Sequence, residues 1–571
     1  MKLRSGASRI VEGLQRGGVR CVFGLPGTQT IELFEALRQS NLRTVIATNE
    51  LSAAFMAGGW ARVTGQPGVL VTISGPGFTW ALTGIAEARL DSVPLVHIVG
   101  SPPPDPIPHR FRQQELPQAE IARPLYKSVI DAEGLSDLAD PIQEALDCAR
   151  SGDPGPVLVQ ISSMSLQLQR TLPELEQRSE PRHEHSPAFA AACARVARSR
   201  RPIFFVGRGT IHHAPLLRQL IERVNAPVIT TPSARGVISE DHPLNLGFRP
   251  FAGRLAEVNK LLDSADVILA IGCKLSHSDT DAFELRLPAD RLIHFDAGPE
   301  VIEANYPTSI GVVADSGTVL RELLRSCTGQ SDWTATELED WRRRLGPQGS
   351  DTVEPTIAGT PARTADGFFK ALRSVLPDNA ILVLDSGLHQ VLARRYYRAH
   401  APHGLLMPTD LQSMGFAIPT AIGARLALPH RPVVALLGDG GFAMTGLELL
   451  SAVRENISLV VIIFVDGAFG QIRLQQLANY GMSHGVMLNN PDFRLLASSL
   501  GLRYESVGSE DDIGEVMRSA INDPGITVAA VSVNDAFQMR RVAATAIARG
   551  VARRTAGPRI LGFLRRLFRR S

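Results

Sequence analysis

The chain of 571 residues has few cysteines, few aromatic side chains and almost no net charge. Its five cysteines occur singly, which excludes a disulfide framework or a zinc site of the usual spacing and predicts reduced thiols. Lys and Arg number 59 against 57 Asp and Glu, so the chain lacks the basic excess of a general nucleic-acid binder. Because 44% of the residues are hydrophobic, the composition also excludes a disordered or fibrous protein.

Long apolar runs are missing as well. No stretch approaches the ~18 unbroken apolar residues that a membrane span requires. The N-terminal segment MKLRSGASRIVEGLQRGG lacks the apolar run of a signal peptide. It places Ile10, Val11 and Leu14 at helical spacing, which predicts an amphipathic first helix. We therefore expect a cytoplasmic protein.

Two polar, proline-containing stretches divide the chain. Residues 167–187 and 328–362 lack apolar periodicity, and we interpret them as linkers. The blocks that remain are close to the usual size of a domain. The predicted domains are residues 1–166, 188–327 and 363–538, followed by a tail at 539–571.

Each block alternates short apolar runs of strand length with longer helical patterns. The runs are continuous, which indicates strands buried on both faces, as in parallel sheets covered by helices. The runs are Cys21–Phe23, Thr44–Ala47, Gly68–Ile73, Leu95–Val99, Val157–Ile161, Ile203–Val206, Val228–Thr230, Val267–Ile271, Leu292–Phe295, Ala380–Leu384, Val433–Leu437, Leu459–Val465 and Thr527–Val533. We predict an α/β fold of three doubly wound parallel-sheet domains, with active sites at the carboxyl ends of the strands.

Acidic residues follow two consecutive strands of the third block. Asp439 lies in the sequence Gly-Asp-Gly-Gly-Phe after the first strand, and Asp466 follows the second, with a helix expected over about Thr445–Asn456 between them. Two carboxylates at one sheet edge form a hard-oxygen site suited to Mg²⁺. The glycines would let backbone N–H groups approach a diphosphate. A lone Gly-Asp-Gly could equally be a simple turn, and the second carboxylate favours the site.

Glu50 stands at a similar position in the first block. It follows the strand Thr44–Ala47 and precedes the almost wholly apolar stretch Ala53–Ala61. We expect this carboxyl to be desolvated and suited to exchange protons with a weak base. The alternative is an ordinary acid at the start of a helix, stabilised by the helix dipole.

These patterns resemble those of thiamine diphosphate-dependent enzymes over residues 4–535. The motifs that carry the resemblance are Phe23-Gly24-Leu25-Pro26-Gly27, Glu50, Ser74-Gly75-Pro76-Gly77, Asp91-Ser92-Val93-Pro94, Asp385-Ser386-Gly387-Leu388-His389-Gln390, Met414-Gly415-Phe416 and Gly438-Asp439-Gly440. The resemblance implies a pyrimidine-binding, a central and a diphosphate-binding domain, in that order. It also implies thiamine diphosphate and Mg²⁺ as cofactors, with the cofactor supplying the covalent chemistry.

The resemblance also implies roles for single residues. Glu50 would be catalytic, bonding N1′ of the aminopyrimidine and promoting loss of the thiazolium C2 proton. Asp439, Asp466 and the carbonyl of Ala468 would bind Mg²⁺, although the family usually has Asn-Asn where this chain has Val465-Asp466. The other implied cofactor contacts are Pro26, Gly27, Pro76, His389, Gln390, Met414 as a wedge between the cofactor rings, Gly438, Gly440, Gly441, Phe442, Phe469, Gly470 and Gln471.

In this family the glutamate faces the metal site of a neighbouring subunit, so the resemblance implies a homodimer or a dimer of dimers. Among the family, the chain is most similar to acetolactate synthases, through AAFMAGGWARVTGQPGV and GPVLVQI. The implied reaction is decarboxylation and carboligation of a 2-oxo acid, as from pyruvate to 2-acetolactate. A non-ligating decarboxylase and a flavin-linked pyruvate oxidase are the alternatives.

Several residues depart from the synthase pattern. Asn49 precedes Glu50 where the synthases have His, Trp80 replaces a small polar residue, and Gln475 replaces a Trp of the second-substrate pocket. FAD is left open and doubtful, because Gly-Cys-Lys-Leu at 272–275 replaces the Gly-Ala-Arg-Phe stretch of flavin-binding synthases.

Polar residues near these motifs are candidates for the substrate pocket. Gln114 and Gln475 are the main candidates, together with His109, Arg473 and His484. A cation such as Arg473 or His109 could pair with a substrate carboxylate. A solvated or internally satisfied side chain is the alternative for each of them.

The C-terminal tail differs from the rest of the chain. Residues 539–571 contain ten Arg and no acid, and apolar residues fall on one helical face within 557–571. This pattern predicts a basic amphipathic helix that could contact an anionic membrane surface. A solvated tail and a helix that docks on a partner are the alternatives.

Overall fold

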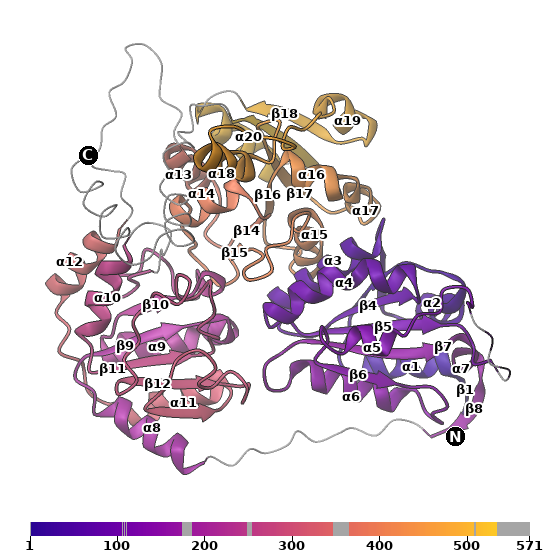
Figure 1. Ribbon diagram of the computed structural model, residues 1–571, viewed down its shortest axis with the longest axis horizontal. Coiled ribbons are helices and arrows are strands. Elements are labelled where there is room, and N and C mark those ends of the chain that lie inside the picture. The colour runs from indigo at the N-terminus through magenta and orange to yellow at the C-terminus, as the bar shows by residue number, and fades with distance from the viewer. Residues whose placement is uncertain are drawn as a thin grey trace.

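The computed structural model describes residues 2–105, 107, 109, 111–173, 186–247, 254–346, 365–507, 510–522 and 524–533. Within these ranges the chain forms three separate parallel sheets with helices on both sides of each (Figure 1). The predicted fold class is therefore confirmed. No helix in the described ranges is long and apolar enough to cross a membrane. The basic tail at 539–571 lies outside the described residues.

The first sheet has six parallel strands in the order β3-β2-β4-β5-β7-β6. Its strands are β2 (Cys21–Gly24), β3 (Arg43–Ile46), β4 (Gly68–Ile73), β5 (Leu95–Ser101), β6 (Ser128–Asp131) and β7 (Pro156–Ser162). Its helices are α1 (Gly6–Arg16), α2 (Ile31–Arg38), α3 (Glu50–Thr64), α4 (Pro76–Leu90), α5 (Gln118–Ala122), α6 (Ala139–Arg150) and α7 (Ser163–Gln167). The predicted amphipathic first helix is confirmed, because α1 buries Ile10, Val11 and Leu14.

A short antiparallel ribbon lies outside this sheet. Strand β1 (Lys2–Ser5) pairs with β8 (Gln169–Leu172), with Lys2 opposite Leu172 and Ser5 opposite Gln169. The ribbon joins the beginning of the described chain to the end of the first domain.

The central sheet has five parallel strands in the order β10-β9-β11-β12-β13. Its strands are β9 (Pro202–Val206), β10 (Val228–Thr230), β11 (Val267–Ile271), β12 (Leu292–Asp296) and β13 (Ile310–Val313). Its helices are α8 (Pro187–Ala197), α9 (Ala214–Val224), α10 (Leu255–Asp263), α11 (Ser316–Ser326) and α12 (Ala335–Leu345). The buried apolar residues of this domain form a core of their own.

The third sheet has six parallel strands in the order β15-β14-β16-β17-β19-β18. Its strands are β14 (Ile381–Leu384), β15 (Leu405–Leu406), β16 (Val433–Gly438), β17 (Leu459–Val465), β18 (Arg503–Val507) and β19 (Ile526–Ser532). Its helices are α13 (Ala365–Val375), α14 (Leu388–Tyr396), α15 (Ala417–Ala427), α16 (Asp439–Thr445), α17 (Leu449–Arg454), α18 (Gly470–Tyr480), α19 (Phe493–Ser499) and α20 (Glu510–Asn522).

The helix expected over about Thr445–Asn456 begins earlier than predicted. It starts at Asp439 as α16, passes through a 3-10 turn, η5 (Gly446–Glu448), and continues as α17 to Arg454. Gly438 is the extended residue before it, and Asp439 supplies an acid in the first turn, which stabilises a helix N-terminus. Gly440 and Gly441 thus lie in the first turn of this helix.

The first and third domains share one hydrophobic core, in which α3 packs against α15. Two glycines allow the close approach of these helices. A methyl group on Gly59 would lie 2.2 Å from the carbonyl oxygen of Thr420, and one on Gly423 would lie 2.0 Å from that of Met56. Since any larger residue would separate the helices, the glycines set the spacing between the two domains.

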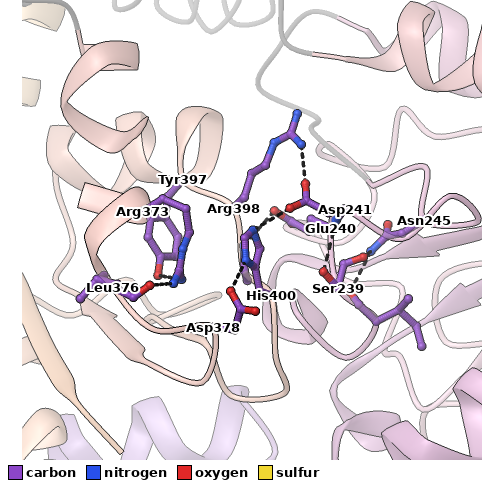
Figure 2. Close-up of polar contacts among 12 residues, drawn as sticks. Ser239, Glu240, Asp241, Asn245, Arg373, Leu376, Asp378, Tyr397, Arg398 and His400 are labelled. Carbon is purple, nitrogen blue, oxygen red and sulfur yellow. Dashed lines mark hydrogen bonds and ion pairs between the residues drawn. The ribbon is translucent and has the colours of Figure 1, made fainter. Parts of the chain in front are cut away.

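The central and third domains meet through charged groups (Figure 2). Arg398 donates to Asp241 at 2.6 Å. His400 lies between two carboxylates, with Nε2 at 3.0 Å from Asp241 and Nδ1 at 2.8 Å from Asp378. Because Asp241 belongs to the central domain and Asp378 to the third, this histidine helps to join them.

Candidate active site

Asp439 lies at the carboxyl end of β16 and is the first residue of α16. It is only 2% exposed. One carboxylate oxygen accepts the N–H of Gly440 at 2.9 Å. The other accepts from the N–H of Gly467 and the side-chain amide of Asn490, each at 2.7 Å. Asp439 therefore joins the glycine-rich turn after β16 to the loop after β17.

Asp466 directly follows β17, the strand next to β16 in the sheet. Its Oδ1 accepts the N–H of Ala468 at 3.1 Å. A methyl group on Gly470 would lie 2.0 Å from its Oδ2, so the glycine leaves room for the carboxylate. Burial, with the negative charge of Asp439, raises the pKa of Asp466 to about 6. Crowded carboxylates of this kind are stabilised by a bound divalent cation.

The loop that carries Ala468 is fixed by a second strand-like segment. Ala468 forms an antiparallel bridge with Met487. Phe469 donates its N–H to Val486, and Leu488 donates its N–H to Gly467, both at 2.8 Å. The backbone at Ala468, predicted to supply the third metal ligand, is thus held in place beside the two carboxylates.

His389 is the predicted cofactor residue of α14 that reaches this turn. Its Nε2–H donates to the carbonyl of Asp385 at 3.0 Å. Burial lowers the pKa of His389 to about 4, so the ring is neutral, with Nδ1 free to accept. A methyl group on Gly438 would lie 3.4 Å from Nδ1. Gln390 instead donates its side-chain amide to the carbonyl of Pro408 at 2.9 Å.

Two phenylalanines were also predicted to contact the cofactor. The ring of Phe442 lies in the core, edge-on to Phe493 with ring centres 5.4 Å apart, so only its backbone is available to a ligand at the turn. The ring of Phe469 lies against Gly440, where a methyl group would approach it to 2.8 Å. Phe469 therefore forms one wall of the glycine-rich turn.

Glu50 lies at the carboxyl edge of the first sheet. It is the half-buried first residue of α3, and Asn49 caps the helix by accepting the N–H of Ser52 at 2.8 Å. A methyl group on Gly77 would lie 3.1 Å from its Oε1. Glu50 therefore lies against the start of α4, beside Gly77.

The loop before Glu50 is held by the third domain. Glu448, which is fully buried at the end of η5, accepts the backbone N–H of Thr48 at 3.1 Å and also its hydroxyl. Ser451 and Arg454 donate to the carbonyl of Ile46, each at 2.9 Å. Glu448 carried no signal in the sequence, because its partner is a backbone group 400 positions away.

Gln114 lies near Glu50, beside the turn that starts α4. It accepts from the side-chain amide of Gln29 at 2.6 Å, and a methyl group on Gly75 would lie 3.0 Å from its Cα. Gln118 accepts the N–H of Gly75 at 3.1 Å. Gln29, two residues after the predicted cofactor contact Gly27, is a further polar group at this edge that the sequence did not single out.

The other substrate candidates are scattered. Gln475 and Arg473 lie on α18, the helix after Asp466, and the charge of Arg473 acts on Asp466. His484 is exposed, and its backbone N–H donates to Gln476 at 2.9 Å. His109 is exposed and pairs with Asp105 at 2.6 Å.

Glu50 and the two aspartates make their contacts in different domains. Asp439 and Asp466 make theirs in the third domain, whereas Glu50 lies against the first. No hydrogen bond or ion pair joins Glu50 to either aspartate in the described part of the chain.

A cavity of about 370 Å³ lies at the junction with the central domain. Six aspartates line it: Asp91, Asp153, Asp279, Asp296, Asp315 and Asp410. Of the lining cations, Lys274 is already paired with Asp153 at 3.1 Å. Arg150, Arg208, His212 and His213 also line the cavity, so its wall carries both acids and cations.

The chain thus consists of three parallel-sheet α/β domains, with a pair of carboxylates beside a helix N-terminus in the third. The family models of thiamine pyrophosphate enzymes match it: the N-terminal TPP binding domain over residues 4–121, the central domain over 189–323 and the C-terminal TPP binding domain over 385–531.

Three proteins that are similar over most of the chain are named as acetolactate synthases or their large subunits. A probable acetolactate synthase large subunit of Methanocaldococcus jannaschii is 30% identical, covering 94% of this chain and 93% of its own. An acetolactate synthase of Mycobacterium bovis is 31% identical, and the alignment covers 95% of this chain and 90% of that protein. The acetolactate synthase isozyme 1 large subunit of Escherichia coli is 29% identical, and the alignment covers 91% of this chain and 92% of that protein. The chain therefore belongs to the thiamine pyrophosphate enzyme family, with acetolactate synthases among its relatives, as its motifs predict.

Proposed function

We propose that the protein is a thiamine diphosphate- and Mg²⁺-dependent carboligase of 2-oxo acids that converts pyruvate to 2-acetolactate. The observation that carries this proposal is the pair Asp439 and Asp466, which follow neighbouring strands at the carboxyl edge of a parallel sheet, beside the glycine-rich start of α16. The names of the relatives support the choice of reaction.

The residues around the turn fit a metal-bound diphosphate. Asp439, Asp466 and the carbonyl of Ala468 would hold Mg²⁺, whose hard-oxygen preference they match. The N-terminus of α16, with the small residues Gly440 and Gly441, would accept the diphosphate. Bound thiamine diphosphate supplies a nucleophilic carbon that adds to the carbonyl of the 2-oxo acid and stabilises the electrons left when CO₂ departs.

Glu50 would act on the other end of the cofactor. Its carboxyl would exchange a proton with N1′ of the aminopyrimidine ring. In the family that the motifs resemble, this glutamate faces the metal site of a neighbouring subunit, so we assign the Glu50 of a second copy to each metal site. The functional unit is then a homodimer with two sites at one interface.

An exposed apolar stripe supports the dimer. Met444, Leu447, Leu450 and Val453 recur every third residue along α16, η5 and α17, and each is 42–57% exposed. Apolar patches of this kind mark protein interfaces. The stripe lies on the helical segment that begins at Asp439, so a second copy seated on it would approach the metal site.

Product analysis with pyruvate, Mg²⁺ and thiamine diphosphate tests the reaction. A carboligase releases one CO₂ for each 2-acetolactate found by mass spectrometry. A non-ligating decarboxylase gives acetaldehyde instead, and an oxidase gives a yellow protein whose flavin is reduced by pyruvate. Absence of CO₂ from every 2-oxo acid tried would leave a non-catalytic relative that has kept the fold. The Asp439→Ala variant is the control for cofactor-dependent turnover.

A further inference from the structure

The segment between β15 and α15 carries Met414, which the resemblance to thiamine diphosphate-dependent enzymes places between the two rings of the cofactor. Met414 itself is only half-buried. The residues on either side of it, Ser413 and Gly415, are buried and are held by carboxylates from two different domains.

Glu87 holds the residue before Met414. It lies on α4 of the first domain and is 1% exposed. Its Oε2 accepts both the backbone N–H of Ser413, at 3.1 Å, and the Ser413 hydroxyl, at 2.6 Å. The carboxylate thus fixes both the backbone and the side chain of Ser413.

Asp385 holds the residue after Met414. It lies at the carboxyl end of β14 and is fully buried. Its Oδ2 accepts the N–H of Gly415 at 3.0 Å, while Oδ1 accepts that of Ser386 at 2.7 Å. A methyl group on Gly441 would lie 2.8 Å from Oδ2, so Asp385 also touches the turn that follows Asp439.

The end of α16 also holds the backbone of Gly415. Thr445 donates its hydroxyl to the carbonyl of Gly415 at 2.9 Å. Gly415 has a φ of +77°, a conformation that favours glycine, and a methyl group there would lie 2.9 Å from Cγ2 of Thr445. The backbone on both sides of Met414 therefore has little freedom.

We propose that Glu87 and Asp385 are positioning residues that clamp Ser413 and Gly415 and thereby set Met414 against the cofactor. The inference rests on the proposed function, because the implied role of Met414 requires bound thiamine diphosphate. Because Glu87 belongs to the first domain and Asp385 to the third, the position of Met414 depends on how these domains pack.

The surroundings of Glu87 suggest which substitutions to use. Arg62 pairs with Asp91 at 2.7 Å beside it, and the Arg62 guanidinium lies 5.1 Å from the ring centre of Phe416. Oε1 of Glu87 has no hydrogen-bond partner among the described residues. Glu87→Gln can keep an acceptor oxygen toward Ser413, whereas Glu87→Leu removes it.

Hydrogen exchange in the cofactor-free protein tests the clamp directly. In Glu87→Leu and Asp385→Ala we expect the amides of 413–417 to exchange faster than in the wild type. Glu87→Gln should keep most of the protection, and Ser413→Ala, which spares the backbone bond, should lose part of it. Asp266→Asn is the matched control, because Asp266 of the central domain also accepts backbone N–H groups and a serine hydroxyl.

Two measurements with Mg²⁺ and thiamine diphosphate test the consequence for Met414. We expect Glu87→Leu to bind the cofactor with an affinity close to that of the wild type, because the metal ligands are unchanged. The exchange rate of the C2 proton on the bound cofactor should fall by about 10–100-fold, the scale of a small misplacement at a reacting centre. Glu87→Gln should restore most of that rate.

Other results would overturn the clamp. Unchanged amide exchange at 413–417 in both Glu87→Leu and Asp385→Ala would contradict the clamp. An unchanged exchange rate of the C2 proton in Glu87→Leu would contradict it as well. If Glu87→Leu fails to fold, hydrogen exchange at the amides of 413–417 in the folded variants Glu87→Gln and Ser413→Ala tests the clamp instead. A wild type that binds no thiamine diphosphate would contradict the proposed function, whereas the amide exchange would still test the clamp.

Discussion

The proposed proton exchange depends on the carboxyl group of Glu50. We expect Glu50→Gln to leave the affinity for Mg²⁺ and thiamine diphosphate almost unchanged, since the diphosphate end of the site is intact. The carboxamide cannot exchange the proton, so the C2 proton of the bound cofactor should exchange roughly 10²–10⁴-fold more slowly. Nuclear magnetic resonance of acid-quenched samples measures this rate. A wild-type rate in the variant would remove Glu50 from the mechanism.

Asp439 is central to retention of the cofactor. It is buried, and its carboxylate also orders Gly440, Gly467 and Asn490. We expect Asp439→Ala to lose Mg²⁺-dependent retention of thiamine diphosphate after dialysis, because both a metal ligand and the order of the turn are lost. Asn490→Ala, which removes one hydrogen bond but no predicted ligand, should weaken retention less. Full retention by Asp439→Ala would contradict the metal site.

Asp296, at the end of β12, gives a pH-dependent prediction. Burial raises its pKa to about 6, with Asp153 and Glu300 raising it further and Lys274 and the N–H of Gly298 lowering it. The folded chain therefore holds this proton to higher pH than the unfolded chain, so the free energy of unfolding falls as the pH rises from about 4 to about 6.

Asp296→Asn removes the buried charge while keeping an acceptor oxygen for Gly298. We expect the variant to raise the free energy of unfolding by about 2–3 kcal/mol above about pH 7. The gain should shrink to about 0.6 kcal/mol near pH 4, where the aspartate is protonated in the folded state and about 40% protonated in the unfolded state. Thermal unfolding at the two pH values measures it, and an equal gain at both would contradict the assignment.

At the scale of elements, the crossing of α3 and α15 offers a matched pair of neighbours. A methyl group on Gly59 would lie 2.2 Å from the carbonyl oxygen of Thr420, whereas one on Gly58 would meet nothing within 4 Å. We expect Gly59→Ala to force the helices apart and lower the melting temperature. Gly58→Ala should leave it unchanged or raise it, since alanine favours a helix by about 1 kcal/mol. Equal effects of the two changes would show that the crossing does not limit stability.

The interior strands could be predicted from the sequence, and several edge strands could not. Strands such as β16 and β17 are buried on both faces, so their apolar runs are continuous. The edge strands β6 and β18 carry half-buried or exposed side chains, and β15 has two residues. Since an edge strand packs on fewer neighbours, its apolar signal is weak.

The candidate site was predictable where topology alone brings residues together. Asp439 and Asp466 follow neighbouring parallel strands, so their proximity follows from the strand order. Asn490, Gln29 and Glu87 reach their partners from loops or from another domain, and no periodicity marks them. Side chains that bind backbone groups at a domain boundary leave no local pattern.

At the scale of the whole molecule, a mixture of two inactive variants can test the shared sites. In a hybrid dimer of Glu50→Gln and Asp439→Ala, one site combines the intact Glu50 of one copy with the intact Asp439 of the other. We expect co-refolded equal amounts to regain about a quarter of the wild-type turnover, because half the dimers are hybrids with one good site each.

Each variant refolded alone is the control for this mixture and should stay inactive. No recovery from dimers shown to be hybrids by mass spectrometry would mean that each site forms within one copy. That outcome would contradict the assignment of Glu50 to the neighbouring metal site while leaving the metal site itself in place.

The apolar stripe gives a prediction for assembly. We expect Leu447→Glu, which places a charge in the middle of the stripe, to shift the protein toward the monomer and to reduce turnover in parallel. Leu495→Glu on α19 is the matched control, because Leu495 is also exposed but lies outside the stripe. Sedimentation velocity measures the mass, and a Leu447→Glu dimer of normal stability would contradict the interface.

The ribbon of β1 and β8 has a consequence for how the protein is made. Lys2–Ser5 are translated well before their pairing partner, Gln169–Leu172, which comes only at the end of the first domain. At typical speeds of synthesis this delay lasts roughly ten to thirty seconds. During that interval the nascent chain carries an unpaired strand, open to chaperones until the ribbon closes.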